Sequence, residues 1–237
     1  MRERETANES WRRAVTAFVA LLVAVGVVVS LIRYLLPTGL HLSVAAPLYG
    51  SYAPEQLPVL ARHPVVEAAH RIGGALYLLI GAMQLSPRLR ARRPALHRWS
   101  GRSFLLLSVI AVASAFIMAA AFPYEIGERA PTLLFGSLML AFAVKGVIHA
   151  RRRRFGAHRE WMMRCYAIGL GIGTIRVLVV LLVNLTALGT RQIIVPVFWA
   201  GFSLTLLAAE LWIRATRRAK AGAARADDEL GPGPASA

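Results

Sequence analysis

Six histidines are the residues of this sequence with the most chemistry to offer, and they form two groups along the chain. A b-type haem in a helical bundle needs two imidazoles that face each other from different helices. The first group lies in and just after the loop that follows the first apolar run, and the second lies at the ends of later apolar runs: His41, His63 and His70, then His97, His149 and His158. Either group can supply a pair of imidazoles, so haem b is the candidate cofactor.

The candidate haem ligands are His97 with His158, or His70 with a partner from the loop before it. Arg98 and Arg159 directly follow two of these histidines, and a guanidinium pairs well with a haem propionate. The same side chains also suit the phosphates of anionic lipid headgroups. Two function classes therefore stay open: a haem- or quinone-linked membrane redox protein, and a non-enzymatic transporter or anionic-lipid-binding protein. The sequence does not decide whether the chain is an enzyme.

Polar residues inside apolar runs form a second candidate site. Glu67, Arg71, Gln84 and Arg176 interrupt such runs, and polar groups are costly in lipid, so they mark packed or functional interiors. Spacings of three and four place most polar residues of the run from 65 to 86 on one helix face. At 1.5 Å per residue, His70 and Arg176 come to similar heights, ~24 and ~21 Å above the cytoplasmic ends of their runs. Glu67 is the expected carboxylate for Arg176 or Arg71.

Several other chemistries find no support in the sequence. The single cysteine, Cys165, cannot form an intramolecular disulfide or a thiolate metal cage, and we expect no metal site. No Gly-x-Ser-x-Gly elbow or phosphate-binding Gly-Lys-Ser/Thr loop is present, so hydrolase and ATPase functions are unsupported. The glycines from Gly169 to Gly173 lie inside an apolar run with no strand before them, which favours helix packing over phosphate binding. Lys145 and Glu210 are at similar depth and are expected to form a structural pair.

These residues must be positioned by membrane helices. Hydrophobic residues make up 57% of the 237 positions, and they fall in blocks of about 20, the length that crosses a hydrocarbon layer of ~30 Å. The sequence predicts an all-α, polytopic bundle with a membrane domain over 14–213, preceded by a short N-terminal segment (1–13) and followed by a disordered tail (214–237). A proline-rich loop over 37–64 is expected to form an ordered cap. The six expected spans cover 14–36, 65–86, 101–122, 131–150, 161–188 and 193–213.

The basic residues give the orientation of the spans. The formal net charge is +16, and alternating sides of six spans place 22 Lys and Arg on one side against 5 on the other. Such an asymmetry predicts that both termini and the two basic turns, around 88–102 and 145–164, face the cytoplasm. The arginines are therefore interpreted as topology signals and lipid contacts, with no nucleic-acid partner. The expected location is the inner (plasma) membrane.

Several of these motifs occur together in one known family. The series runs from His70-Arg71 through Gln84 and His97-Arg98-Trp99-Ser100-Gly101-Arg102 to His158-Arg159-Glu160-Trp161 and Arg176. This order resembles the predicted membrane proteins grouped as domain of unknown function 2306, over about residues 65–180. The resemblance implies a membrane protein and carries no activity with it. Ser103 and Cys165 depart mildly from the pattern of the family.

Overall fold

The fold is a bundle of long helices. The computed structural model describes residues 2–35, 59–122 and 126–230, and no strand occurs in that part of the chain. The all-α class predicted from the sequence is confirmed. The helices are α1 (Arg2–Leu35), α4 (Pro64–Gln84), α5 (Pro87–Arg92), α6 (Pro94–Ala121), α7 (Ile126–Arg151), α8 (Phe155–Leu185) and α9 (Thr190–Leu230).

Six of these helices are long and apolar enough to cross a membrane, which confirms the predicted number of spans. They are α1, α4, α6, α7, α8 and α9. Each helix begins earlier than the predicted span, and at the basic turns this is because part of the turn is itself helical: α6 begins at Pro94 and α8 at Phe155. Proline opens α4, α5 and α6, where its missing N–H costs no hydrogen bond.

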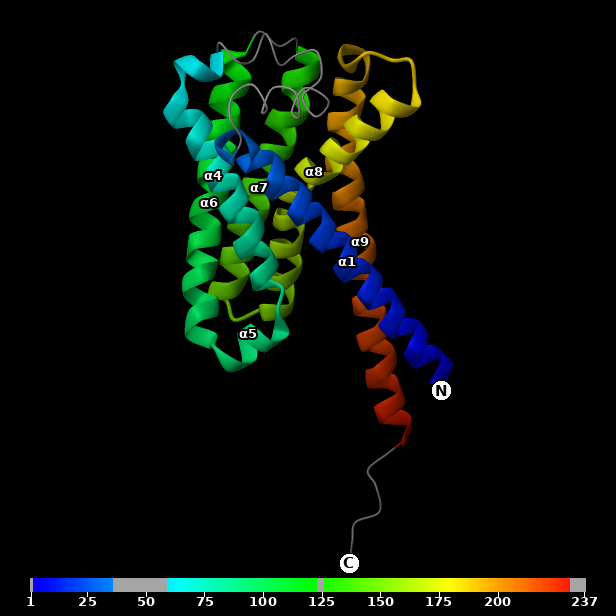
Figure 1. Cartoon of the computed structure of the whole chain (residues 1–237). Coiled ribbons are helices and arrows are strands. Elements are labelled where there is room, and N and C mark those ends of the chain that lie inside the picture. Colours follow the sequence, from blue (N-terminus) through cyan, green and yellow to red (C-terminus); the bar gives the residue numbers. More distant parts are fainter. Residues whose placement is uncertain (1, 36–58, 123–125, 231–237) are drawn as a thin grey trace, which may run out of the picture.

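The two ends of the bundle differ in charge. Figure 1 shows α5, the α7–α8 turn, the first residues of α1 and the last turns of α9 at the same end. We name this end the basic end, because the exposed arginines of α5 and of the α7–α8 turn lie there. The opposite, far end carries the start of α4 and the α8–α9 connection. The expected cap over 37–64 lies largely outside the described residues, and residues 59–62 of it are helical.

The C-terminal segment differs from its prediction. Disorder was expected from residue 214, but α9 continues without a break to Leu230. The expectation is therefore wrong for 214–230, and the rest of the tail lies outside the described residues. The physical reason is that Ala and Arg, both strong helix formers, dominate 214–226 and prolong a helix that is already nucleated in the membrane.

Four helices form a ring of neighbours. α6 and α8 each pack against α4 and α7, so they lie diagonally opposite each other. α1 packs on α4 and α8, and α9 packs on α8 and α7. Half of the most apolar part of α8 is buried within the protein, more than in any other of the six helices. α8 is therefore the central helix.

Three glycines let α8 approach three different helices. A methyl group at Gly169 would collide with the Tyr77 ring of α4, and one at Gly171 would collide with Phe202 of α9. A methyl group at Gly173 would meet the main-chain oxygen of Leu22 in α1. The prediction that this glycine run serves helix packing is confirmed.

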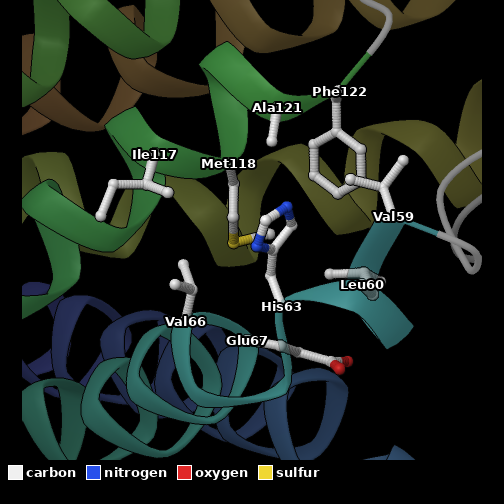
Figure 2. Close-up of a pocket in the computed structure, with 9 residues that line it drawn as sticks. All are labelled: Val59, Leu60, His63, Val66, Glu67, Ile117, Met118, Ala121 and Phe122. Atoms are coloured by element: carbon white, nitrogen blue, oxygen red, sulfur yellow. The ribbon is translucent and has the colours of Figure 1, made fainter.

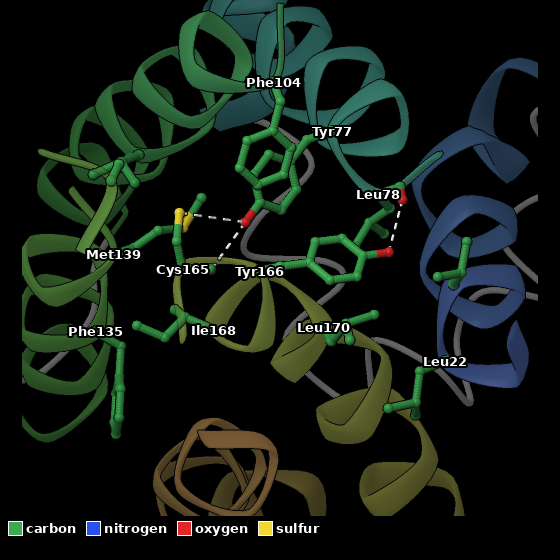
Figure 3. Close-up of a cluster of buried hydrophobic side chains, with 13 residues drawn as sticks. Leu22, Tyr77, Leu78, Phe104, Phe135, Met139, Cys165, Tyr166, Ile168 and Leu170 are labelled. Atoms are coloured by element: carbon green, nitrogen blue, oxygen red, sulfur yellow. Dashed lines mark hydrogen bonds between the residues drawn. The ribbon is translucent and has the colours of Figure 1, made fainter. Parts of the chain in front are cut away.

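Aromatic side chains fill the middle of the ring of helices. The rings of Tyr77 and Phe104 are stacked with centroids 4.6 Å apart, and Tyr166 lies 5.9 Å from Tyr77. The hydroxyl of Tyr77 donates to the main-chain oxygen of Cys165 at 2.9 Å, as Figure 3 shows. The Cys165 side chain is fully buried against this cluster, so this free thiol packs as a small apolar residue.

Two ion pairs tie α8 to α9 near the basic end. Arg164 and Glu210 form a bidentate ion pair, in which two guanidinium nitrogens donate to the two carboxylate oxygens. Arg217 and Glu160 form a pair of the same kind. The expected partner of Glu210 was Lys145, and that expectation is wrong. The ammonium of Lys145 instead lies 4.5 Å from the centre of the Trp161 ring, because α7 faces the tryptophan of α8 at this height.

Candidate functional site

Two of the candidate haem ligands lie at the basic end (Figure 1). His97 lies in the first turn of α6 and His158 in the first turn of α8, on diagonally opposite helices of the ring. They are close enough for a charge on His158 to act on His97. The fold therefore brings two histidines from different helices to the same end of the bundle (Figure 1).

Hydrogen bonds define the state of the His158 ring. Its Nδ1 lies 2.8 Å from the main-chain oxygen of Gly146 in α7. A carbonyl oxygen only accepts hydrogen bonds, so Nδ1 carries the proton, and Nε2 keeps its lone pair in the neutral ring. This is the arrangement found in metal-ligating histidines, which donate their other N–H to a carbonyl or carboxylate.

The His97 ring is less constrained. Its Nδ1 is buried and has no hydrogen-bond partner within the described residues. The start of α6 is nevertheless fixed to α4, because the Gln84 side chain donates to the main-chain oxygen of His97 at 3.2 Å and to the Ser100 hydroxyl. A buried nitrogen without a partner is costly.

Arg98 and Arg159 follow these histidines on the exposed surface of the basic end. Their side chains are exposed and do not enter the interior of the bundle. A role toward a bound group would involve the edge of that group, such as a carboxylate that reaches the surface.

The far end carries the second polar cluster. The Nε of Arg71 donates to Glu67 at 2.9 Å, and the two side chains are 12% and 4% exposed, so this is a buried ion pair within α4. The structure thus joins Glu67 to Arg71, one of the two partners expected for it. The charge of Arg176, from α8, acts on His70, which fits the similar heights derived from the sequence.

The His70 ring is anchored to α6. Its Nδ1 lies 3.2 Å from both the main-chain oxygen of Ala111 and the Ser114 hydroxyl. That hydroxyl already donates to the main-chain oxygen of Ile110, so both neighbours of Nδ1 act as acceptors. His70 therefore has the same tautomer as His158, with its proton on Nδ1.

Gln84 does not belong to the far-end cluster. It is at the last turn of α4, near His97, whereas Glu67 and Arg71 are in the first turns of the same helix. The four polar residues grouped from the sequence therefore serve two separate places. Glu67, Arg71 and Gln84 lie on the same helix, but at opposite ends of α4.

A small pocket opens beside the far-end cluster. Its volume is about 10 Å³, which is room for one water molecule. Figure 2 shows the His63 ring in this pocket, between α4 and α6, while the Glu67 carboxylate points to one side of it. His41 lies outside the described residues. The lining residues are Val59, Leu60, His63, Val66, Glu67, Ile117, Met118, Ala121 and Phe122.

The comparisons with known proteins identify the family. The family model described as predicted membrane protein (DUF2306) matches residues 68–213, more than half of the chain. The chain belongs to this family. In the searches of curated proteins and of solved structures, nothing matches the chain. The predicted resemblance to DUF2306 is confirmed, and the matched region extends beyond residue 180 to include most of the membrane part of α9.

The DUF2306 region also holds residues that reasoning from the sequence missed. Gly146 accepts the hydrogen bond of His158, and Ser114 accepts that of His70. Ser114 had a signal, since a serine in an apolar run often bonds back to its own helix and faces a neighbour. Gly146 had none, because it acts through its main-chain oxygen.

Among the described residues, no group of three or more His, Cys, Asp or Glu side chains is arranged to hold a metal ion.

Proposed function

We propose that this membrane protein is a redox protein that binds a b-type haem at its basic end, between His97 and His158. The observation that supports the proposal is the orientation of His158, whose Nδ1 is held by the Gly146 carbonyl, at the basic end of the bundle, which also carries, across the bundle, the first turn of α6 with His97 (Figure 1). Two imidazoles are a ligand set for haem iron, whereas a quinone needs no imidazole pair. The haem alternative is therefore preferred to a quinone site.

The residues present fit this group. The Nε2 of His158 is the nitrogen left with a lone pair, and His97 would bind through its Nε2, because its Nδ1 is buried. Arg98 and Arg159 are exposed beside the two histidines and would pair with propionates at the membrane surface. When bound, the haem supplies a one-electron redox couple. The protein would hold the iron by its imidazoles and keep water from it with the helices around them.

A reduced-minus-oxidised absorption spectrum tests the proposal. The detergent-purified protein, made with adequate haem supply, is expected to show the alpha band of a b-type haem. His158→Asn keeps an amide donor for the Gly146 oxygen and removes Nε2, so it should abolish the band while the protein, now without haem, still folds. A wild-type protein without an alpha band would refute the haem site.

A second candidate function, binding of anionic lipid headgroups without catalysis, rests on a different observation. Trp99 is 66% exposed at the basic end, and the guanidinium of Arg102 lies 4.6 Å from the centre of its ring. An aromatic ring with a cation on it suits the interface between hydrocarbon and headgroups. Lipid binding is preferred to transport, because Tyr77, Phe104 and Tyr166 pack together in the middle of the bundle. Native mass spectrometry should show retained phosphatidylglycerol in preference to phosphatidylcholine.

The membrane in question is proposed to be the inner (plasma) membrane, with the basic end in the cytoplasm. The support is the excess of Lys and Arg at this end, which keeps such segments on the cytoplasmic side during insertion. A topology reporter, described in the Discussion, tests this orientation.

A further inference from the structure

The turn between α7 and α8 contains four consecutive arginines in an unusual backbone arrangement. Arg151 is the last residue of α7, and Arg152, Arg153 and Arg154 connect it to α8. Arg153 has a φ of 56°, and it is the only residue other than glycine with a positive φ in the part of the chain that the structure describes. A side chain in this left-handed conformation is disfavoured by a contact between its Cβ and the backbone.

Hydrogen bonds show which helix end this is. The N–H of Arg154 bonds to the oxygen of His149, and the N–H of Arg153 bonds to the oxygen of Ala150. These two bonds make up the Schellman motif, in which the left-handed position is most often glycine and sometimes asparagine. Arg153 occupies that position. The sequence therefore has a strained arginine where glycine would fold more easily, and a strained residue is a reason to look for a function.

The charges of this turn are available to a partner. All four arginines are exposed, and none of them takes part in an ion pair within the described residues. The helices on both sides are membrane spans, Arg129–Arg151 and Phe155–Leu185. The turn joins two membrane-crossing helices through three linking residues, so its guanidiniums lie at or beside the membrane surface. The anions nearest to this position are the phosphates of phospholipid headgroups, which favours a lipid partner over a soluble macromolecule.

We propose that Arg151–Arg154 forms a binding site for the phosphate groups of anionic phospholipids, and that Arg153 is retained for its charge despite its backbone strain. This inference rests on the second candidate function and locates it at one turn. It is independent of the haem site, because these side chains lie on the surface of the turn. Guanidiniums bind phosphate in a bidentate manner, and a negatively charged leaflet attracts each nearby arginine.

Substitution of Arg153 separates charge from strain. Arg153→Gly removes both, so the melting temperature in a neutral maltoside detergent should rise by a few degrees. The affinity for phosphatidylglycerol, measured in the same detergent, should nevertheless fall by about fivefold, the effect of one arginine near an anionic surface. Arg153→Lys keeps charge and strain but loses the bidentate guanidinium, so its melting temperature should stay close to wild type and its affinity should fall less than that of Arg153→Gly. A purely structural role would move stability and lipid affinity in the same direction.

Two controls test whether the change in lipid affinity depends on the position of the arginine and on the kind of anion. Arg62→Gln removes one charge from an exposed arginine near the far end and should leave the affinity unchanged. Inorganic phosphate and polyglutamate should stabilise the wild type less than phosphatidylglycerol does, and equal stabilisation by either would overturn the assignment to lipid. If the wild type binds phosphatidylglycerol and Arg153→Gly binds it equally well, the site is wrong but lipid binding stands. If the wild type does not distinguish phosphatidylglycerol from phosphatidylcholine, both fail.

Discussion

Tyr77 and Tyr166 cross between α4 and α8 in opposite directions. Each ring lies against a glycine of the other helix, Tyr77 against Gly169 and Tyr166 against Gly81. Each hydroxyl donates to a main-chain oxygen on the other helix, at 2.9 Å for Tyr77 and 2.8 Å for Tyr166. The two helices are therefore locked both in rotation and in register by a reciprocal contact.

Adding one methyl group to this contact should destabilise the protein. Gly81→Ala and Gly169→Ala each place a Cβ inside the volume of a tyrosine ring, and overpacking of this kind costs about 1–3 kcal/mol. Thermal unfolding in detergent measures the loss. Gly74→Ala is the matched control on α4, because no atom lies within 4 Å of its added Cβ, and alanine favours the helix. Equal melting temperatures for the three variants would contradict the packing.

The two ion pairs between α8 and α9 should contribute differently to the stability of the protein. The Arg164 side chain is 13% exposed, and its guanidinium also lies 4.6 Å from the centre of the Trp161 ring. Arg164→Gln is therefore expected to lose about 1–2 kcal/mol, since it leaves Glu210 half-buried without its partner. Arg217 is 63% exposed, and Arg217→Gln should have a smaller effect that fades in high salt. The reverse order of melting temperatures would be incompatible with this geometry.

The tautomer of His70 can be tested by a pair of amides. Asparagine presents its NH2 group near the position of Nδ1 and can keep the bond to the Ala111 oxygen, whereas glutamine presents it near Nε2. His70→Gln should therefore unfold at a lower temperature than His70→Asn, by the value of one hydrogen bond, about 1 kcal/mol. If the glutamine variant is the more stable one, Nε2 carries the structural bond and the assignment is wrong.

The guanidinium of Arg176 should be needed in the interior. Arg176→Leu removes a charge that acts on His70 and leaves its polar neighbours in apolar surroundings, so we expect a loss of about 2–4 kcal/mol and lower expression. Arg176→Lys keeps the charge and should lose less. Unchanged melting of the leucine variant would mean that Arg176 lies outside the polar cluster.

The orientation of the bundle can be read with reporters. A fluorescent protein that folds only in the cytoplasm, fused after Ala237, should fluoresce, because the excess of arginine holds the basic end on that side. A phosphatase that is active only outside the cytoplasm should be inactive at the same position. A dark fluorescent fusion together with an active phosphatase would mean that the bundle is inverted.

The sequence predicts the spans well because hydropathy and charge act on each segment separately. It also predicts Arg71 as a partner of Glu67, because the two residues are one helical turn apart. The partner of Glu210 was missed for a physical reason: distance along a helix gives height, and the choice between Lys145 and Arg164 depends on rotation about the helix axis. The same limit applies to Gln84, whose face was predicted but whose partners, His97 and Ser100, depend on how α6 begins.

The main-chain acceptors were beyond reach of the sequence. Every residue has a main-chain carbonyl, so the residue types at Gly146 and Ala111 do not indicate that their oxygens orient an imidazole. The disorder expected after residue 214 failed because composition was considered without the helix that precedes it.

The central position of α8 also means that the early helices are synthesised before their main packing partner. Tyr77 and its acceptor at Cys165 are 88 residues apart, and α1 presents its Leu22 main chain to a glycine of the same late helix. At about 5–20 residues per second, the ribosome needs roughly 4–18 s to deliver this partner after α4 has been made. During that interval the early helices must wait in the bilayer with polar and aromatic faces turned to lipid, or be shielded by the insertion machinery.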